Sequence, residues 1–315
     1  MPEIKKILVI RFSSLGDIIL TFPLLKKIRK KHATAEIHFL TKNVYEEALK
    51  LSPQINKILL YENSLRGIRE KIKQENYDVI IDLHKNFKSI FVSIFNSRKL
   101  YRYKKENFKK FLLVKFKINL FKEIIPVYKK YILSAKDILN ANDFEYEFDQ
   151  LKFTRDSIVD GKYTVIAPST RHFTKTYPAE KFIDYINRSP GRKFLLVGDK
   201  SENDISVCSL IESKCKNVLN MCGKLNMIAL TNIIHNSEEV ICNDSAILHL
   251  SEAAGKKVIA VFGSTVKEFG FFPQLKNSVV LENTAMKCRP CTHIGRESCP
   301  EIHFRCMDIQ IPFKN

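Results

Sequence analysis

The 315-residue sequence is poor in glycine and proline, with 10 glycines and 11 prolines. This scarcity excludes collagen-like and low-complexity chains, which need far more of both residues. The sequence also lacks a run of about 18 uncharged apolar residues, the length that a membrane-spanning helix needs. The opening stretch MPEIKKILVIRF has too short an apolar part for a secretory signal. We therefore expect a protein that is cytoplasmic or bound to a membrane face.

Acidic residues are scarce relative to basic ones. There are 52 Lys and Arg against 34 Asp and Glu, which gives a net charge of +18. This charge favours an anionic partner, such as nucleic acid, an acidic membrane, phosphates or acidic sugars. Residues 1–150 carry +13 of it, and the excess is sharpest at residues 98–130, where aromatic residues alternate with basic ones. That segment predicts a surface for an anionic lipid headgroup, although a solvated lysine-rich helix has a similar composition.

The hydrophobic pattern of the first half alternates strands with amphipathic helices. With 45% hydrophobic residues the chain can form two cores, and its length favours two domains of about 150 residues. We predict strands at 6–11, 35–40, 57–61, 78–83 and 99–103. The helices are expected at 17–32, 44–51, 65–74 and 87–96, with two basic helices following to about residue 140. This alternation predicts a parallel sheet covered on both faces.

Residues 141–161 interrupt this pattern with the acidic stretch ANDFEYEFDQ and the turn Asp160-Gly161. The alternation then resumes, with strands at 163–167, 193–197, 217–220, 239–242 and 257–262 and helices at 179–187, 202–213, 226–235 and 246–254. We therefore predict an α/β protein of two doubly wound, Rossmann-like domains, 1–155 and 156–315, facing a central cleft. In such domains, ligands bind at the carboxyl ends of the strands.

The segment IRFSSLGDIILTFP, residues 10–23, passes from a strand through a short turn into a helix. The hydroxyls of Ser13 and Ser14 can hydrogen-bond a ligand, and Gly16 permits a close approach of the backbone. Asp17 adds a carboxylate at the end of the strand. Asp17 is therefore a candidate site residue, with a simple helix N-cap as the alternative.

A second loop, APSTRHFTKTYP at residues 167–178, follows a strand of the second half. Ser169 and Thr170 supply neutral donors, and the single lysine, Lys175, supplies a point charge. This combination suits a diphosphate. A solvated loop without a ligand is the alternative.

The third segment, NDSAILHLSEAAGKKVIAVFGST at residues 243–265, begins at a junction between a strand and a helix. Backbone amides at the helix N-terminus form an anion site. His249 is expected either to face that anion or to lie in the core beside leucines. The residues expected to line the crevice are Asp244, Ser245, Ala246, His249 and the triplet Gly263-Ser264-Thr265, which ends the next strand. The second and third segments thus converge on one edge of one sheet.

Together, the motifs SSLGDIILTFP, KTYP and NDSAILHLSEAAG…VFGST resemble glycosyltransferase family 9, whose best-known members are the ADP-heptose:lipopolysaccharide heptosyltransferases. The resemblance runs from about residue 6 to the cysteine-rich tail. It implies a GT-B fold, with the acceptor bound by the first domain and the sugar nucleotide mainly by the second. It also implies an inverting transfer that needs no metal and no cofactor.

The resemblance implies roles for individual residues. Asp17 would be the general base that takes a proton from the acceptor hydroxyl, and Lys175 would stabilise the departing diphosphate. Glu202 matches an acidic position that holds the ribose hydroxyls, although a carboxylate at a helix N-terminus is the alternative. The implied donor-binding residues are Ser169, Thr170, Glu202, Asp244, Ser245, Ala246, His249 and Thr265.

The resemblance is looser on the acceptor side. The candidate residues are Ser13, Ser14, Gly16, Arg66, Arg69, Lys85, Lys88 and Arg102. Each basic residue alone is also explained as a solvated charge. As a group, they fit a polyanionic acceptor of the Kdo-lipid A type, so we expect a protein peripheral to the cytoplasmic face of the inner membrane.

Two departures from the family pattern concern the donor loops. Ser245-Ala246 stands where many relatives have Thr-Gly, and Tyr177-Pro178 where they have Trp-Pro. The added methyl group of Ala246 leaves the identity of the donor open. The alternatives are a family member with another nucleotide sugar, a sugar-nucleotide epimerase and, from the charge alone, a nucleic-acid-binding protein. No zinc-finger, RRM or KH pattern supports the last of these.

The carboxyl-terminal tail contains four cysteines in the pattern C-x2-C-x7-C-x6-C, namely Cys288, Cys291, Cys299 and Cys306. Their spacing permits a structural zinc. It departs from paired CxxC motifs, however, so we expect free thiols and no metal. The remaining cysteines are expected to be small core residues: Cys208, Cys215, Cys222 and Cys242.

Overall fold

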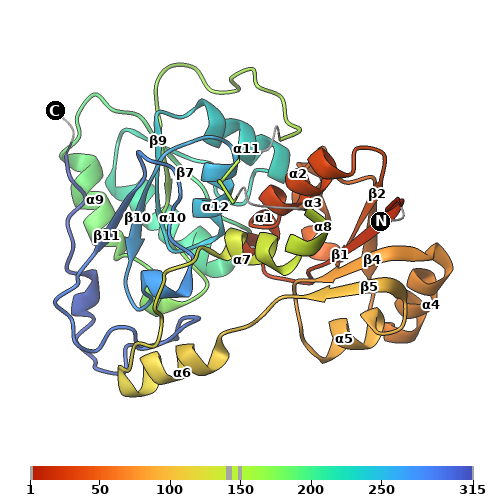
Figure 1. Ribbon diagram of the computed structural model, residues 1–315. Coiled ribbons are helices and arrows are strands. Elements are labelled where there is room, and N and C mark those ends of the chain that lie inside the picture. Colours follow the sequence, from red (N-terminus) through yellow and green to blue (C-terminus); the bar gives the residue numbers. More distant parts are fainter. Residues whose placement is uncertain (1–2, 140–143, 148–150, 314–315) are drawn as a thin grey trace. The chain divides into compact units, whose positions relative to one another are not determined.

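The computed structural model describes residues 3–139, 144–147 and 151–313 (Figure 1). The chain forms two compact units. Unit 1 comprises Met1–Lys105 and Ile125–Lys152, and unit 2 comprises Glu106–Ile124 and Phe153–Asn315. Residues 106–124, which the sequence analysis assigns to the first domain, thus cluster with unit 2. Of the acidic stretch 141–150, only residues 144–147 lie within the described part of the chain.

Unit 1 is built on a parallel sheet of five strands in the order β3-β2-β1-β4-β5. The strands are β1 (Lys6–Ile10), β2 (Glu36–Lys42), β3 (Lys57–Tyr61), β4 (Tyr77–Asp82) and β5 (Ser97–Arg102). Strand β1 lies between β2 and β4, and four of its five residues are buried. The order in which the strands are added to the sheet reverses between β1 and β4. Doubly wound sheets bind their ligands at this point.

The helices of unit 1 differ from expectation at one important place. They are α1 (Leu15–Ile19), α2 (Phe22–Lys31), α3 (Glu46–Lys50), α4 (Leu65–Glu75), α5 (Phe87–Ser93), α7 (Val127–Ser134) and α8 (Lys136–Leu139). The single helix predicted at 17–32 is two helices, because Pro23 lies in the first turn of a new helix, where its missing N–H costs nothing. Helix α1 begins before Asp17, since Ser14 and Asp17 form a capping box.

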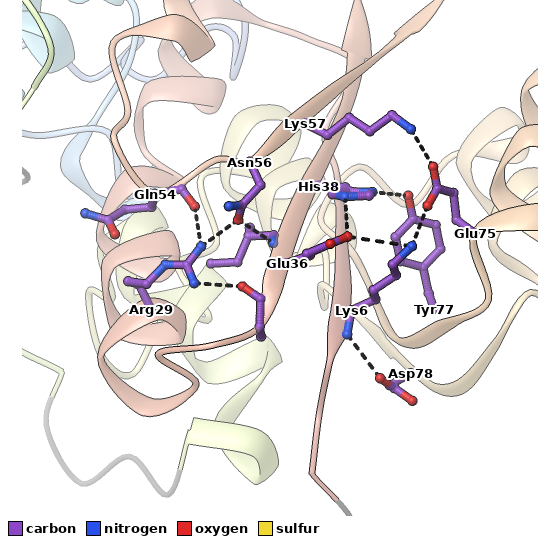
Figure 2. Close-up of polar contacts among 12 residues, drawn as sticks. Lys6, Arg29, Glu36, His38, Gln54, Asn56, Lys57, Glu75, Tyr77 and Asp78 are labelled. Carbon is purple, nitrogen blue, oxygen red and sulfur yellow. Dashed lines mark hydrogen bonds and ion pairs between the residues drawn. The ribbon is translucent and has the colours of Figure 1, made fainter.

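A charged network joins the amino ends of the strands of unit 1 (Figure 2). Glu75 accepts hydrogen bonds from the ammonium groups of Lys6, at 2.8 Å, and Lys57, at 2.5 Å. These two bonds lower the pKa of Glu75 to about 2. The ring of the buried His38 lies 2.7 Å from the hydroxyl of Tyr77. The network therefore stabilises the amino ends of these strands, whereas Asp17 follows the carboxyl end of β1.

Unit 2 contains a parallel sheet of six strands in the order β11-β10-β9-β6-β7-β8. The strands are β6 (Thr164–Ala167), β7 (Phe194–Leu196), β8 (Val218–Asn220), β9 (Glu239–Asn243), β10 (Val258–Phe262) and β11 (Val279–Glu282). The direction of winding reverses between β6 and β9. The edge strand β11, whose residues are exposed or partly buried, was not predicted.

The helices of unit 2 include the one contributed by residues 106–124. They are α6 (Asn107–Phe116), α9 (Ala179–Asn187), α10 (Glu202–Lys214), α11 (Met227–Asn236) and α12 (Ala246–Ala253). Short 3-10 turns occur at η2 (Phe173–Lys175), η3 (Lys267–Phe269) and η4 (Arg305–Met307). In the described part of the chain, no helix has the length and apolar character to cross a membrane.

Four cysteines of unit 2 are buried, as predicted. They are Cys208, Cys215, Cys222 and Cys242. Burial raises the pKa of each of these thiols, so they remain protonated at neutral pH. Their interpretation as small core residues is therefore confirmed.

Candidate active site

The carboxylate of Asp17 is held by three residues at the carboxyl end of β1. Its Oδ2 atom lies 2.8 Å from the Arg11 guanidinium and accepts hydrogen bonds from the Ser14 hydroxyl, at 2.8 Å, and the Ser14 amide, at 3.2 Å. Its Oδ1 atom accepts a hydrogen bond from the Tyr131 hydroxyl at 3.0 Å. Helix α7, which carries Tyr131, thus contributes to the same site as α1.

These contacts keep Asp17 ionised although it is largely buried. Burial alone would raise the pKa of Asp17, but the Arg11 charge and the hydrogen bonds from Ser14 and Tyr131 outweigh it. The pKa of Asp17 is therefore below its ordinary value. A carboxylate oxygen has two lone pairs, and Tyr131 uses one of those on Oδ1. The second lone pair of Oδ1 is suited to receive a hydroxyl group of a ligand.

Arg11 links the two strands that flank the reversal of the sheet in unit 1. It follows β1, and its guanidinium donates a hydrogen bond of 2.7 Å to the carbonyl of Leu83, directly after β4. Burial lowers its pKa, but the neighbouring Tyr131 and Asp17 outweigh burial and raise it, so Arg11 stays charged. The sequence analysis missed Arg11 and Tyr131. An arginine at the end of a buried strand signals a buried anion, whereas Tyr131 is too distant in sequence to leave a local signal.

Further basic groups surround this carboxylate. His84 follows β4, and its pKa falls to about 4 through burial and the charges of Arg11 and Lys105. The pKa of Lys105 is also lowered, first by burial and then by Arg11. His84 is therefore neutral at pH 7, while the surroundings remain positively charged. An anionic ligand fits this edge of the sheet better than a cation.

Three of the basic residues proposed for the acceptor, Arg69, Lys88 and Arg102, have partners within unit 1. Arg69 donates to the carbonyls of Phe91, at 3.1 Å, and Ile94, at 3.5 Å. Lys88 donates to the Tyr61 hydroxyl at 3.3 Å.

Arg102 lies 3.7 Å from the buried carboxylate of Asp82 and donates to the Ser93 hydroxyl at 3.3 Å. Arg66 and Lys85 are exposed, Ser13 is half-buried, and Gly16 is buried in α1. Of the predicted acceptor residues, only Ser14 has a hydrogen bond to Asp17 among the described contacts.

In unit 2, an ion pair joins the loops after β6 and β9, and a hydrogen bond adds the loop after β10. The Lys175 ammonium lies 2.7 Å from Oδ2 of Asp244, and the Thr265 hydroxyl donates to the same oxygen at 2.6 Å. Both side chains of the ion pair are largely buried. The convergence predicted for Lys175, Asp244 and Thr265 is therefore confirmed by these distances.

Asn243 fixes the loop that carries Lys175, a role that the sequence analysis missed. Its amide nitrogen donates to the carbonyl of Pro168 at 2.9 Å, and its amide oxygen accepts from the backbone N–H of Tyr177 at 2.9 Å. Both ends of the loop are thereby held to the end of β9. Asn243 directly precedes Asp244 and Ser245, but no sequence pattern reveals its contact with Tyr177, which lies 66 residues away in the chain.

The hydroxyl groups of Ser169 and Thr170 both have hydrogen-bond partners within unit 2. Ser169 donates to Asp204 at 2.5 Å, and the Thr170 hydroxyl contacts the His172 carbonyl at 2.9 Å. Asp204 also accepts from the Asp199 amide at 2.8 Å. Glu202 is exposed at the first position of α10. Ser169 and Thr170 thus lie in the loop after β6 and Asp204 holds that loop, while Lys175 and Asp244 form the ion pair.

Two hydroxyl groups near the ion pair are buried without a partner in the described part of the chain. They belong to Ser245, the N-cap residue of α12, and Ser264, which follows β10. A buried hydroxyl without a hydrogen bond is costly. Together with the N-terminus of α12, which favours negative charge, they suit an anionic ligand with acceptor oxygens. His249 is buried, with its ring 6.0 Å from that of Phe271, as in the core alternative.

The four cysteines of the tail lie near one another. Burial raises the pKa of Cys306 to about 11, and the thiols of Cys291, Cys299 and Cys288 contribute electrostatically. All four are free. Within the residues that the structure describes, no group of three or more His, Cys, Asp or Glu side chains is arranged to hold a metal ion.

Comparisons with known proteins identify the family and the fold of this chain. The family model "Glycosyltransferase family 9 (heptosyltransferase)" matches residues 65–300. Lipopolysaccharide heptosyltransferase 3 of Escherichia coli K12 is 25% identical over 286 residues, covering 79% of this chain and 80% of that protein. Lipopolysaccharide heptosyltransferase 1 of Campylobacter coli is 26% identical over 323 aligned residues, covering 92% and 93%.

A solved structure, the E. coli ADP-heptose lipopolysaccharide heptosyltransferase II, is also similar. It superposes with a TM-score of 0.72 at 17% identity, covering 96% of this chain and 97% of that one. The two Rossmann-like units therefore form a glycosyltransferase of the GT-B fold. Since the family model matches more than half of its residues, the chain belongs to glycosyltransferase family 9, the heptosyltransferases.

Proposed function

We propose that this enzyme transfers a heptose from ADP-heptose to the Kdo/heptose inner core of lipopolysaccharide, with inversion at the anomeric carbon. Membership of the heptosyltransferase family supports the reaction class. The relatives support the substrates, since one is named an ADP-heptose lipopolysaccharide heptosyltransferase. The observation that carries the proposal is the ionised carboxylate of Asp17, held by Arg11, Ser14 and Tyr131 with one lone pair of Oδ1 unused by them.

Asp17 acts as the general base in this proposal. An ionised aspartate is a weak base, with an ordinary pKa of about 4, and its contacts lower that pKa further. Proton transfer is therefore late, when the acceptor oxygen has already begun to bond to the anomeric carbon and has become acidic. The role of Arg11 and Ser14 is to fix the carboxylate so that Oδ1 receives that proton.

The donor diphosphate binds at the carboxyl edge of the sheet in unit 2. Lys175 supplies the positive charge that stabilises the leaving group, and the N-terminus of α12 supplies backbone amides. The unpartnered hydroxyls of Ser245 and Ser264 donate to its oxygens. Asp244, which holds Lys175 in the free enzyme, contacts the donor sugar when Lys175 turns to the phosphate. Glu202 receives the ribose hydroxyls.

The transfer step balances without a further reactant. The acceptor oxygen forms a bond to the anomeric carbon, while the bond between that carbon and the diphosphate oxygen breaks. ADP leaves with the electron pair, and the acceptor proton passes to Asp17. Because the acceptor attacks from the side opposite the leaving group, the configuration inverts. The residues assigned to the step are side chains and backbone amides of this chain alone.

The acceptor in this proposal is polyanionic and borne by a membrane. The positive surroundings of Asp17, from Arg11 and Lys105, support an acidic sugar close to the reacting hydroxyl. A lipid-borne acceptor also requires that the enzyme work at the surface of the inner membrane, on its cytoplasmic side. We therefore propose peripheral association with that membrane.

The test is transfer of labelled heptose from ADP-heptose to a defined Kdo-lipid A acceptor, compared with the same acceptor already carrying one heptose. Incorporation into either acceptor supports the proposal, and the preferred one identifies the position modified. ADP-glucose and UDP-glucose serve as control donors. Transfer from one of these, but not from ADP-heptose, would overturn the donor assignment while leaving the glycosyltransferase class intact.

A further inference from the structure

Helix α6 presents an unusual concentration of apolar side chains to solvent. Phe108, Phe111 and Phe116 are 68%, 54% and 56% exposed. Ile118 and Leu120, just beyond the helix, are 49% and 44% exposed. Since single exposed apolar residues are ordinary but contiguous groups mark interaction sites, this surface needs a partner. We call these five residues, together with Lys115, the α6 surface.

The exposed side chains follow one side of the helix. Phe108, Phe111 and Lys115 are spaced at i, i+3 and i+7, which places them along one face. The Phe116 ring packs edge-to-face on that of Phe111, with ring centroids 5.9 Å apart. Leu113 is the residue of α6 that is buried. The helix therefore has a docked side and a separate apolar side.

Contacts within unit 2 fix the docked side in place. The Lys110 ammonium lies 5.8 Å and 5.9 Å from the ring centroids of Phe269 and Phe271. At the end of the helix, the Lys117 ammonium donates to the carbonyls of Cys288, at 2.9 Å, and Pro290, at 2.6 Å. The apolar side is thus displayed by a helix whose other side is anchored. Figure 1 shows the course of α6, drawn in yellow beside its label.

The charge around this surface is mainly positive, although Asn119 donates a hydrogen bond of 3.2 Å to Glu268 and Lys109 pairs with Glu106 at 2.7 Å. Residues 107–122 contain five lysines and no acidic residue. Among them, Lys115 lies on the exposed face, and Lys122 is also exposed. Aromatic side chains next to lysines bind where an apolar layer meets negative charge, as at the surface of an anionic bilayer. The lysines contact headgroups there, and the phenylalanines enter the boundary with the acyl chains.

We propose that the α6 surface docks the enzyme onto an anionic lipid bilayer. This inference rests on the proposed function, because a lipid-borne acceptor is what brings the enzyme to a membrane. It goes beyond that function by assigning the contact to unit 2, through residues outside both candidate binding sites. A folded protein partner or a second copy of the chain fits the apolar residues, but the excess of lysines over acidic residues favours an anionic lipid surface.

The test measures sedimentation of the full-length enzyme with vesicles of phosphatidylethanolamine and phosphatidylglycerol, and with neutral phosphatidylcholine vesicles. We expect binding to the anionic vesicles, weakened as salt is raised because exposed charges are screened. The triple variant F108S/F111S/F116S should lose at least about tenfold in partitioning, since burial of each phenylalanine contributes to binding. The variant Lys115→Glu should weaken binding to the anionic vesicles and leave binding to the neutral vesicles unchanged.

A matched control removes exposed aromatic residues elsewhere. Phe87 and Phe95 of unit 1 are 80% and 90% exposed, so F87S/F95S changes surface apolarity without touching α6. Circular dichroism melting checks that each variant folds. Equal binding by F108S/F111S/F116S and the wild type would overturn the proposal, as would loss of binding in the control alone. Concentration-dependent dimerisation that the triple variant abolishes, without any vesicle binding, would instead assign the surface to a second copy.

Activity separates this proposal from the proposed function. With a water-soluble Kdo acceptor that lacks acyl chains, the triple variant should have the same kcat/KM as the wild type. With acceptor in anionic vesicles, its rate should fall in proportion to its lost binding. Absence of heptose transfer by the wild type on both acceptors would contradict the proposed function, while vesicle binding would still report on α6 independently.

Discussion

The guanidinium of Arg11 lies 2.8 Å from Oδ2 of Asp17, and both side chains are largely buried at the end of β1. The same guanidinium reaches the carbonyl that follows β4. The Arg11 side chain thus connects the carboxyl ends of β1 and β4 and keeps the proposed base, Asp17, ionised. The pair therefore combines a structural role with control of the pKa of Asp17.

Replacement of Arg11 by Gln should move the pH profile of activity. Without the cation, burial is no longer outweighed and the pKa of Asp17 rises, by about 1–3 units for loss of a close opposite charge. Because the base works only when deprotonated, the acid limb of kcat/KM should move to higher pH. Rates measured between pH 4 and 9 on a soluble acceptor test this.

The variant Arg11→Lys is the control for the charge. It keeps the positive charge but loses the forked contact to Asp17 and Leu83. Its acid limb should stay close to that of the wild type. Removing one partner of a buried ion pair destabilises by about 3–5 kcal/mol, so thermal melting accompanies each profile. An unchanged acid limb in folded Arg11→Gln would show that the Arg11–Asp17 pair does not set the pKa of the base.

Replacement of Asp17 by Asn should abolish transfer but preserve nucleotide binding. Loss of a general base lowers the rate about 10²–10⁴-fold, while Lys175 and the N-terminus of α12 belong to unit 2 and remain intact. Turnover and the thermal shift caused by ADP are measured on the same preparation. Loss of the ADP shift in Asp17→Asn would make Asp17 a donor ligand or a structural residue instead of the base.

The arrangement of strands was largely predictable, because buried parallel strands leave continuous apolar runs such as KILVIR. The predictions for 57–61 and 179–187 coincide with β3 and α9. The break between α1 and α2 was missed, since apolar spacing continues across it and only Pro23 marks it. Strand β11 was missed because its apolar run, Val279–Leu281, is short.

The candidate site was predictable only where its residues follow one another in the chain. The motif around Asp17 is local, and so is the segment from Asn243 to Thr265. Tyr131 reaches Asp17 across 114 residues, a contact made by tertiary packing alone. The assignment of residues 106–124 to unit 2 likewise depends on contacts such as Lys117 to Cys288, which no sequence pattern reveals.

Replacement of Ser264 by Ala should separate ligand binding from stability. Within the residues that the structure describes, the Ser264 hydroxyl is buried without a partner, and leaving such a group unsatisfied costs about 1–3 kcal/mol. Its removal should therefore leave the melting temperature of the free enzyme unchanged or raise it. If the hydroxyl donates to the nucleotide, the ADP-induced shift should decrease.

The neighbouring Thr265 provides a matched control. Its hydroxyl donates to Asp244 at 2.6 Å in the free enzyme, so Thr265→Val should lower the melting temperature without ligand. Differential scanning fluorimetry with and without ADP distinguishes the two variants. A full ADP shift in Ser264→Ala would remove Ser264 from the proposed donor site.

Replacement of Glu252 by Gln should remove part of the pH dependence of stability. Glu252 is buried in α12 and accepts hydrogen bonds from the backbone N–H groups of Gln274 and Leu275. Burial raises its pKa from 4.5 to about 7, although these bonds oppose the shift. Between those pH values the folded state binds the proton and the unfolded state has lost it, so the unfolding free energy falls as pH rises.

The size of this effect follows from the shift in the pKa of Glu252. At about 1.4 kcal/mol for each pKa unit, the wild type should lose about 3 kcal/mol through this residue between pH 4.5 and 7. The half-buried His84 opposes this trend, because its pKa falls from 6.5 to about 4 and its contribution to the unfolding free energy is lost as the pH falls. The difference in unfolding free energy between Glu252→Gln and the wild type at each pH isolates the contribution of Glu252. Urea unfolding at pH 5, 6, 7 and 8 should show the variant gaining relative stability with rising pH, and parallel curves would mean that Glu252 is ionised throughout.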